Sequence, residues 1–261
     1  MPSYAFNPAG RFGDRVADYI RYRPGYPTAL VDLMVDCGYV RPGDAIADIG
    51  SGTGMLAERF LERGYVVFCV EPNEAMRQGA EDHLSAAPGF MSVSGSAEST
   101  GMADDSVSLV MAGQAFHWFD APAAHREFQR ILRPEGACAL VWNARLLDSS
   151  PFALEYEALL IRQGTDYCDV RHQGITATST RDLASFFAPF TMAYDVVGRV
   201  RQEFDFEALA GRLFSSSYMP NRNDPRAPQI LDELHDLFDR HHEHGYVRVE
   251  YDTKVYHGRL V

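Results

Sequence analysis

The chain has 261 residues, of which 46% are hydrophobic, and it carries a formal net charge of −12 at pH 7. This length and composition fit one large globular domain or a domain with a substantial insertion. Lys254 is the only lysine and the sequence holds no cluster of basic residues. That argues against a nucleic-acid surface, because binding phosphates needs clustered Lys and Arg.

The four cysteines are widely spaced and form no C-x-x-C pair. Cys69 and Cys138 fall inside predicted buried strands, where a free cysteine acts as a small hydrophobe, so we expect reduced structural thiols. The first residues lack a basic segment followed by an apolar stretch, and no run approaches the ~20 apolar residues of a membrane span. These observations predict a cytoplasmic protein without a signal peptide or membrane segment.

The first strong structural signal is the segment 45–54, Ala-Ile-Ala-Asp-Ile-Gly-Ser-Gly-Thr-Gly. A short apolar run ends in Asp48 and three alternating glycines, and a helical pattern follows at once. The apolar residues on one face of that helix are Met55, Leu56, Phe60 and Leu61. A strand, a tight glycine turn and a helix predict the nucleotide-binding corner of a doubly wound α/β sheet.

Two details of this glycine turn choose between cofactors. The dinucleotide fingerprint G-x-G-x-x-G would place its third glycine where this chain has Met55, whereas the third glycine here is Gly54. The Asp48 carboxylate would lie beside the ligand, where it repels a pyrophosphate and attracts a cation. S-adenosylmethionine offers an ammonium and a sulfonium group, so the turn favours that cofactor. A turn that only packs a helix on a strand is the structural alternative.

The next segments continue the pattern of a doubly wound sheet. Residues 65–70 predict a second strand that ends at Glu71, where a carboxylate accepts hydrogen bonds from a ribose diol. Residues 90–95 predict a third element that leads into Ala97 and Glu98, a loop that would flank an adenine.

A fourth strand is expected at residues 105–111, followed by the segment 114–119, Gln-Ala-Phe-His-Trp-Phe. An amphipathic helix to Leu132, a turn at 133–136 and a fifth strand at 137–142 complete this part of the pattern.

The order of these segments resembles a class I S-adenosylmethionine-dependent methyltransferase, and segment 114–119 is similar to the small-molecule, type 11 branch of that family. The resemblance covers about residues 1–145. It implies that the glycine turn wraps the methionine part of S-adenosyl-L-methionine, with S-adenosyl-L-homocysteine as the product. The cofactor-binding residues that it implies are Asp48, Gly50, Ser51, Gly52, Gly54, Glu71, Pro72, Asn73, Met76, Ala97, Glu98, Gln114 and Ala115.

The resemblance also includes two N-terminal segments, 11–14 and 22–27, where the family places a lid over the cofactor. Tyr22 and Arg23 are expected to bind the cofactor, and Tyr26 belongs to the same lid. The guanidinium of Arg23 would form a bidentate pair with the cofactor carboxylate. An exposed helix end followed by a Pro-Gly turn is the alternative.

We therefore expect one methyltransferase domain with a doubly wound, seven-stranded, mostly parallel sheet of Rossmann-like type. Helical insertions would cap the carboxyl edge of this sheet, where open α/β sheets bind ligands. The expected parts are an N-terminal lid and first helix (1–40), a cofactor-binding core (41–144), two substrate-capping insertions (145–190 and 206–242) and the last two strands (192–204 and 246–260). Helices are predicted within the insertions at 152–162, 180–187, 206–214 and 228–242.

Methyl transfer from a sulfonium is an in-line displacement, so the main task of the protein is to place the acceptor atom. His117 is the candidate catalytic residue, either as a base for an acceptor that loses a proton or as a positioning group. Gln114 would orient a substrate or cofactor amine. The expected acceptor-binding residues, each with a place in the core or at a helix end as its alternative, are Trp118, Phe119, Trp142, Arg212 and Tyr218.

The run 241–244, His-His-Glu-His, invites a metal site, but a helix end that favours cations accounts for it, so we predict no metal. The sequence predicts methyl transfer to oxygen, nitrogen or carbon of a small molecule. It predicts no nucleic-acid partner and no membrane partner. We expect the chain to be a monomer or a homodimer. An RNA methyltransferase, a nicotinamide-dependent oxidoreductase and a non-catalytic cofactor-binding protein are the alternatives.

Overall fold

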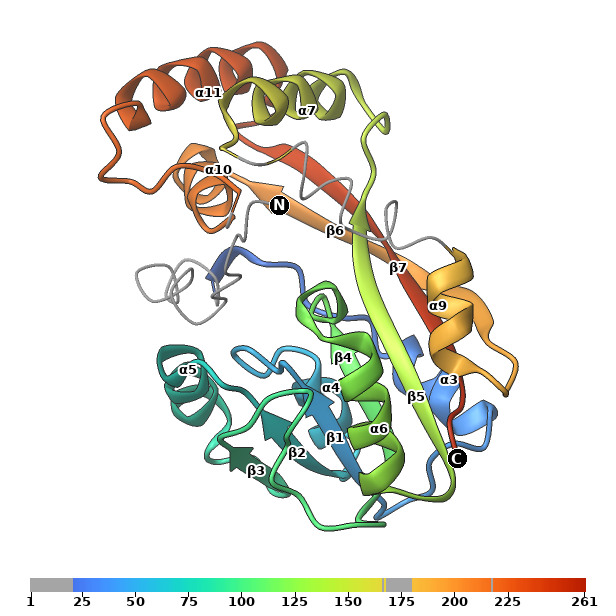
Figure 1. The fold of residues 1–261 in the computed structure, drawn as a ribbon. Helices are drawn as coiled ribbons and strands as arrows, with labels where there is room; N and C mark the ends of the chain where they lie inside the picture. The colour runs from blue at the N-terminus through green and yellow to red at the C-terminus, as the bar shows by residue number, and fades with distance from the viewer. Residues whose placement is uncertain (1–20, 166, 168–179, 217) are drawn as a thin grey trace, which may run out of the picture.

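The computed structural model describes residues 21–165, 167, 180–216 and 218–261. Its strands form one seven-stranded sheet in the order β3-β2-β1-β4-β5-β7-β6 (Figure 1). β1 to β5 are parallel, whereas β7 runs antiparallel to both β5 and β6. The strands are β1 (Ala45–Ile49), β2 (Val66–Val70), β3 (Phe90–Val93), β4 (Val107–Gly113), β5 (Leu132–Arg145), β6 (Ala193–Phe204) and β7 (Val247–Arg259). The predicted seven-stranded α/β fold is confirmed.

Four helices begin where a polar side chain caps the first turn. The side chains of Asn73, Asp120, Ser150 and Asp205 each accept a hydrogen bond from the backbone N–H three residues later, which satisfies a donor that the helix leaves free. The helices are α3 (Ala29–Asp36), α4 (Ala57–Leu61), α5 (Glu74–Leu84), the short η2 (Phe116–Trp118), α6 (Ala121–Ile131), α7 (Pro151–Gln163), α9 (Thr180–Phe187), α10 (Phe206–Phe214) and α11 (Ala227–His241).

Two apolar layers cover the two faces of the sheet. One layer joins the strands to α6 and α9 through residues such as Phe128 and Phe187, and the other joins them to α3 and α4 through Leu30 and Phe60. Cys69 and Cys138 are buried in these layers as free thiols, which confirms their predicted structural role. Cys168 lies outside the described residues.

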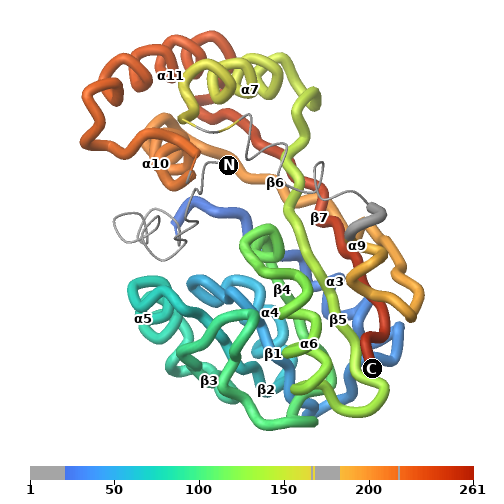
Figure 2. The backbone as a smooth tube through the Cα atoms, viewed as in Figure 1, coloured from blue at the N-terminus to red at the C-terminus, as the bar shows by residue number. Residues whose placement is uncertain are grey.

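A third apolar cluster lies beyond the carboxyl end of β5. There α7, α10 and α11 pack on one another and on the near ends of β6 and β7, through side chains such as Leu160, Leu213, Leu234 and Tyr251. Figures 1 and 2 show these three helices, here called the three-helix cap, gathered at one end of the molecule, with residues 21–28 running between the cap and the ends of β1 and β4. A ligand at the carboxyl edge of the sheet therefore faces the cap.

The observed elements differ from the predicted ones in three places. The helix after the glycine turn begins only at Ala57, because the turn continues through Leu56, and Met55 is half-buried instead of lying on the core face. β4 covers Val107–Gly113 instead of 105–111. β5 runs from Leu132, which already pairs with Val107, to Arg145, so the turn predicted at 133–136 and the strand bounds 137–142 are wrong. The division into a cofactor core over 41–144 and capping insertions stays a prediction.

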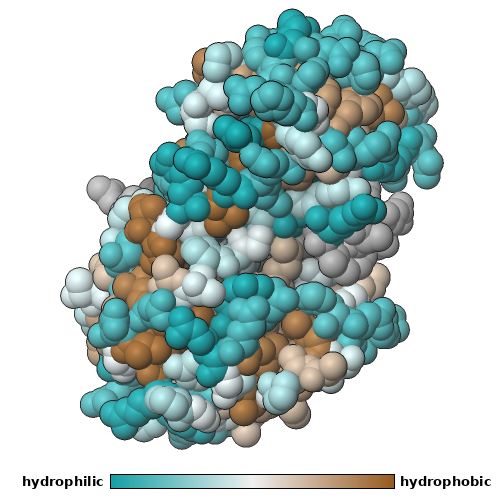
Figure 3. Space-filling model, turned by 180° about the vertical axis from the view of Figure 1, so that it is seen from behind, coloured by the Kyte–Doolittle hydropathy of each residue, from teal (hydrophilic) through white to brown (hydrophobic). Residues whose placement is uncertain are grey.

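The surface is mainly hydrophilic. Within the described ranges, no helix combines the length and apolar character needed to cross a membrane. Large exposed apolar side chains such as Met91, Leu154 and Tyr194 come from different elements, and on the face drawn in Figure 3 the hydrophobic patches are separated by hydrophilic surface.

Candidate active site

The glycine turn at the carboxyl end of β1 leaves an open strip of backbone. Gly50, Gly52 and Gly54 all have positive φ angles, of 66°, 57° and 82°. A Cβ on Gly50 would lie 2.7 Å from the Cβ of Ala115, so packing excludes a side chain there. A Cβ on Gly52 would meet only the Cε atom of Met76, at 3.8 Å. The turn is thus closed by packing at its ends and open at Gly52, where a ligand can approach the backbone.

Asp48 lies beneath this turn as a buried acid. Its side chain is 1% exposed, and within the described part of the chain neither carboxylate oxygen has a hydrogen-bond partner. Burial raises the pKa of Asp48 to about 7; the nearby Ala57 amide lowers it without reaching hydrogen-bonding geometry, and Glu71 raises it. A buried carboxylate without a donor is stabilised by a cationic ligand group, and the ammonium of S-adenosylmethionine fits this requirement.

Glu71 connects the end of β2 to the glycine turn. Its Oε2 atom accepts a hydrogen bond from the Gly52 N–H at 2.9 Å, and its Oε1 atom accepts one from the Asn73 N–H at 2.8 Å. Burial raises the pKa of Glu71, although the two amides and the guanidinium of Arg77 act in the opposite direction. Each carboxylate oxygen retains a second acceptor site, so Glu71 can still bind ribose hydroxyls.

Asn73 caps the N-terminus of α5, and this start of the helix places Met76 next to the glycine turn. The Asn73 Oδ1 atom accepts a hydrogen bond from the Met76 N–H at 3.0 Å, and the Met76 side chain is buried next to Gly52. The structure therefore brings together two predicted segments that are separate in sequence, with the residues Asp48, Gly50, Ser51, Gly52, Gly54, Glu71, Pro72, Asn73 and Met76.

The predicted adenine loop is fastened to the start of α6. Ala97 is buried in the apolar layer beside α6, and the Glu98 Oε1 atom accepts a hydrogen bond from the Asp120 N–H at 2.9 Å. This contact holds the loop against the segment that follows β4. Whether the two residues flank an adenine stays a prediction.

Gln114 and Ala115 close the site on the β4 side. Gln114 has a positive φ of 57°, and its N–H donates to the Val141 carbonyl at 2.8 Å. Its side-chain Nε2 donates to the Asn143 carbonyl at 3.1 Å, so the amide group is held in place by β5. Ala115 touches the glycine turn at Gly50. The side-chain Oε1 atom of Gln114 has no hydrogen-bond donor among the described residues. This atom is therefore the one that would orient an amine, as predicted for Gln114.

His117 lies in the short helix η2, immediately after β4. Burial lowers the pKa of its imidazole to about 4, so the ring is neutral at physiological pH. Its Nδ1 atom is buried without a hydrogen-bond partner among the residues described, and the ring lies 4.8 Å from that of Trp118, centroid to centroid. The pKa is low because the ring is desolvated and no acidic neighbour offsets this effect.

Two predicted acceptor-binding aromatics pack inside the apolar layer beside α6. The Phe119 ring lies next to the glycine turn and edge-on to Phe128, with ring centroids 6.2 Å apart. Trp142 is 4% exposed and lies edge-on to both Phe116 and Tyr256. Its indole N–H is buried without a partner in the described ranges. Contact of either ring with an acceptor stays a prediction.

The N-terminal segment joins the three-helix cap to the sheet. The Tyr22 ring packs on the backbone of Gly211 in α10, and the Tyr22 carbonyl accepts a hydrogen bond from Gln202 Nε2 at 3.4 Å. The Arg23 guanidinium donates to the Ser215 carbonyl at 3.2 Å. These contacts attach Tyr22 and Arg23 to α10 and β6. Segment 11–14, the other part of the predicted lid, lies outside the described residues.

The same segment is pinned at the ends of β4 and β5. The Asn143 Nδ2 group donates to the carbonyls of Pro24 and Gly25, at 3.3 and 3.0 Å. The Tyr26 hydroxyl lies so close to Gly113 that a Cβ there would be 2.6 Å away. Residues 22–26 therefore run along the carboxyl edge of the sheet, between the cofactor corner and the cap.

Arg212 is a buried cation in the three-helix cap. It is 6% exposed, and it donates from Nε to the Tyr251 hydroxyl at 3.2 Å and from Nη1 to the Ser216 hydroxyl at 2.8 Å. Its guanidinium also lies over the Tyr251 ring, 6.0 Å from the centroid.

Tyr218 lies among three guanidinium groups. Burial alone would raise the pKa of its hydroxyl, but Arg212, Arg23 and Arg145 together lower that pKa below its ordinary value. The Tyr218 ring lies 4.7 Å from that of Tyr167, centroid to centroid. The structure thus places the predicted residues Arg212 and Tyr218 in one cluster.

Arg145 belongs to this cluster and was not among the residues predicted from the sequence. It forms an ion pair with Glu157 in α7, donates to the Tyr167 hydroxyl at 3.2 Å and lies over the Tyr156 ring. The spacing in the sequence could have indicated it, because Arg145 follows Asn143 by two residues and both side chains therefore lie on the same face of β5.

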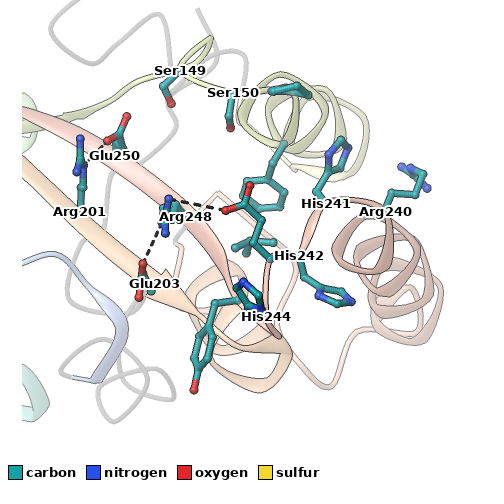
Figure 4. A pocket seen from close by; sticks show the side chains of 15 residues that line it. Ser149, Ser150, Arg201, Glu203, Arg240, His241, His242, His244, Arg248 and Glu250 are labelled. Carbon is teal, nitrogen blue, oxygen red and sulfur yellow. Dashed lines mark hydrogen bonds and ion pairs between the residues drawn. The ribbon is translucent and has the colours of Figure 1, made fainter.

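One cavity of the described structure is separate from this site. It has a volume of about 730 Å³ and is lined by residues of α7, α11, β6 and β7 at the far end of the cap, with none of the predicted cofactor residues (Figure 4). Its arginines are paired with carboxylates: Arg248 with Glu203, and Arg201 with Glu250. The run 241–244, which we weighed as a metal site and predicted not to be one, lies at this cavity. In the described part of the chain, no group of three or more His, Cys, Asp or Glu side chains is arranged to hold a metal ion.

Comparison with known proteins identifies the central part of the chain. Residues 47–140 match the model of the family described as Methyltransferase domain. This part of the chain is a methyltransferase domain of the type 11 family. An uncharacterized methyltransferase of Mycobacterium tuberculosis is 40% identical over 135 residues, which is 51% of this chain and 52% of the relative. One of Schizosaccharomyces pombe is 31% identical over 156 residues, 59% of each protein.

The chain thus spans between half and two thirds of the length of these curated relatives. Its fold is similar to that of a provisionally named type II methyltransferase from Anaeromyxobacter dehalogenans, with a TM-score of 0.66 and 23% identity over 92% of this chain and 99% of that one. A provisionally named S-adenosylmethionine-dependent methyltransferase from Methanococcus maripaludis gives a TM-score of 0.56, at 18% identity over 72% and 89% of the two chains. The methyltransferase fold therefore extends well beyond the matched domain.

Proposed function

We propose that the chain transfers a methyl group from S-adenosylmethionine to a small-molecule acceptor by in-line displacement. The observation that carries this proposal is the Asp48 carboxylate, buried without a hydrogen-bond donor beneath a glycine turn that is open at Gly52. An acid in that position rejects a pyrophosphate and accepts a ligand with an ammonium group.

Different residues of the site would bind different parts of the cofactor. Asp48 would bind its ammonium, and Glu71, oriented by the amides of Gly52 and Asn73, would accept hydrogen bonds from its ribose hydroxyls. Gln114, fixed by its bond to β5, would present its carbonyl oxygen to an amine. When bound, S-adenosylmethionine supplies a methyl group that is already activated by the sulfonium. The chain then needs mainly to orient the acceptor and exclude water.

For His117, a positioning role is better supported than a role as base. A base works best when its pKa is near the working pH, and the buried imidazole has a pKa of about 4. Its Nδ1 atom can still donate or accept a hydrogen bond, depending on the tautomer, and so orient the acceptor.

A small-molecule acceptor fits the chain better than RNA does. The net charge of −12 and the single lysine disfavour a phosphate backbone. Arg212 in the cap is buried, which suits a small anionic group better than a duplex or a strand.

Thermal-shift titration tests the cofactor. We expect S-adenosylmethionine and S-adenosylhomocysteine to raise the melting temperature, because a ligand that binds only the folded state stabilises it, and we expect NAD to have no effect. Asp48→Asn should abolish the shift at the same ligand concentrations, whereas Asp82→Asn, on the outer surface of α5, should retain it. A shift with NAD and none with either sulfur compound would overturn the proposal.

A further inference from the structure

The cluster around Arg212 contains more positive than negative charge. The described contacts of Arg212 are to the neutral hydroxyls of Tyr251 and Ser216, and within the described ranges no carboxylate contacts it. Arg145 is paired with Glu157, so that carboxylate is already engaged, and the Tyr167 hydroxyl donates to the same oxygen at 2.6 Å. The two guanidinium groups of Arg145 and Arg212 are therefore accompanied by one carboxylate, which contacts Arg145 alone.

A buried cation without an anion is unfavourable, because neutral hydroxyls replace only part of its hydration. Such a group is common where a ligand supplies the missing charge, because an arginine fork binds a carboxylate or phosphate through two parallel hydrogen bonds. In Arg212, Nη2 has no partner among the described residues, while Nε and Nη1 are fixed by Tyr251 and Ser216. The protein thus holds the guanidinium in one orientation and leaves its Nη2 group without a described hydrogen-bond acceptor.

The strand register places this cluster on the side of the sheet that carries the N-terminal segment. Arg145 pairs with Tyr251, and Asn143 pairs with Thr253, in the antiparallel ladder of β5 and β7. Directly opposed side chains lie on one face of a sheet, as do alternate residues of one strand. Because Asn143 binds the backbone of residues 24–25, Arg145 and the hydroxyl partner of Arg212 lie on that same face.

The cluster is also at a suitable distance from the cofactor corner. The last pairing of β4 with β5 joins Gly113 to Val141, and β5 continues to Arg145. Four residues of strand span about 13 Å, which an extended organic molecule and the long arginine side chains can bridge together. A molecule anchored at the cluster therefore reaches back toward the loop of residues 114–119.

On the basis of the function proposed above, we propose that Arg212, together with Tyr218 and Tyr251, binds an anionic group of the methyl acceptor. The acceptor is thus a small organic anion that carries a carboxylate or a phosphate, and not a neutral or cationic amine. A buried, low-dielectric region with net positive charge attracts such anions even in an acidic protein. The lowered pKa of the Tyr218 hydroxyl is in line with a positive potential at this point.

Calorimetric titration of the wild-type protein, saturated with S-adenosylhomocysteine, tests the inference without any variant. The probes are succinate, tricarballylate and glycerol 3-phosphate, with succinamide and glycerol as their neutral counterparts. We expect at least one anion to bind at least tenfold more tightly than its neutral counterpart. Preference for a carboxylate or for a phosphate among the anions identifies which group the cluster takes.

Variants then assign the binding to the cluster. Arg212→Gln should weaken the anion at least tenfold, Arg212→Lys should restore part of the affinity, and Arg199→Gln, an exposed arginine paired with Asp252, should have no effect. All variants should bind S-adenosylhomocysteine as the wild type does, which shows that they are folded.

The outcomes separate this inference from the proposed function. Absence of S-adenosylhomocysteine binding by the wild type contradicts the proposed function itself. Normal binding of that ligand, with no anion preferred over its neutral counterpart or with an anion affinity unchanged by Arg212→Gln, leaves the function intact and overturns the anionic acceptor.

Discussion

Asp48 shows how one residue can serve binding at the expense of stability. Its pKa is about 7 in the folded protein, against about 3.9 in an unfolded chain. Because the folded state resists ionisation, the buried carboxylate destabilises the fold increasingly as pH rises from about 4 to 7, and the penalty is constant above that range. A cofactor ammonium would remove this penalty.

We therefore predict that Asp48→Asn stabilises the ligand-free protein at pH 8, by an amount on the order of 1–4 kcal/mol. The difference in melting temperature from the wild type should shrink as pH falls toward 4, where the wild-type carboxyl is protonated. The same variant should bind S-adenosylmethionine at least tenfold more weakly. Differential scanning calorimetry from pH 4 to 8 measures the first effect, and a melting temperature lowered by the substitution at pH 8 would show that Asp48 is satisfied within the protein.

His117 gives a second prediction, based on the pH dependence of turnover. With a pKa of about 4, the imidazole stays neutral down to about pH 5, so kcat at saturating cofactor should not fall with a midpoint near 7 on the acidic side. His117→Gln should leave cofactor affinity unchanged and lower kcat/KM for the acceptor at least tenfold. An acidic limb near pH 7 that disappears in His117→Gln would instead identify the imidazole as a base.

Among the elements, the segment 22–26 depends most on one buried side chain. Asn143 donates to the Pro24 and Gly25 carbonyls and accepts a hydrogen bond from the Thr253 hydroxyl at 2.6 Å. It is 7% exposed, so its removal leaves several buried groups without partners. A lost buried hydrogen bond of this kind costs about 1–3 kcal/mol.

We predict that Asn143→Ala lowers the melting temperature by about 2–8 °C and increases proteolytic cleavage near residues 21–27. It should also raise KM for the acceptor, because this segment separates the cofactor corner from the cap. Asn223→Ala, on the exposed loop before α11, is the matched control and should do neither. Equal stability and equal protease resistance of Asn143→Ala and the wild type would show that the segment is held by other contacts.

The elements themselves were largely predictable from the sequence. α9 and α10 have the predicted bounds, and β6 and β7 lie within a residue of theirs, because apolar spacing and polar caps mark their ends. The exception is α4, where the helical pattern begins before the helix does. The helix begins at Ala57, two residues after the predicted start at Met55. The positive φ of Gly54 and the packing of Leu84 against it hold the backbone out of a helix at that point.

At the scale of the whole molecule, the cofactor side of the site was predictable, because its motifs are close together in the sequence. Asp48, Gly52 and Glu71 lie within one unit of β1, glycine turn, α4 and β2, so their spacing alone places them together. The acceptor side depends on contacts that no local pattern reveals, such as Arg23 with Ser215, or the register that sets Arg145 beside Tyr251. Arg212 and Tyr218 were recognised only as polar candidates, and their buried cluster of arginines was not predictable. The oligomeric state and the cytoplasmic location stay predictions.

The length of β5 beyond β4 has a consequence for the order in which the two halves of the site assemble. The cofactor corner closes loops of a few tens of residues, whereas the acceptor side exists only after β7 has paired with β5 and α10 has met residues 22–23. Closing longer loops is entropically harder and slower. During folding, the protein would thus gain the ability to hold its methyl donor before it can hold any recipient.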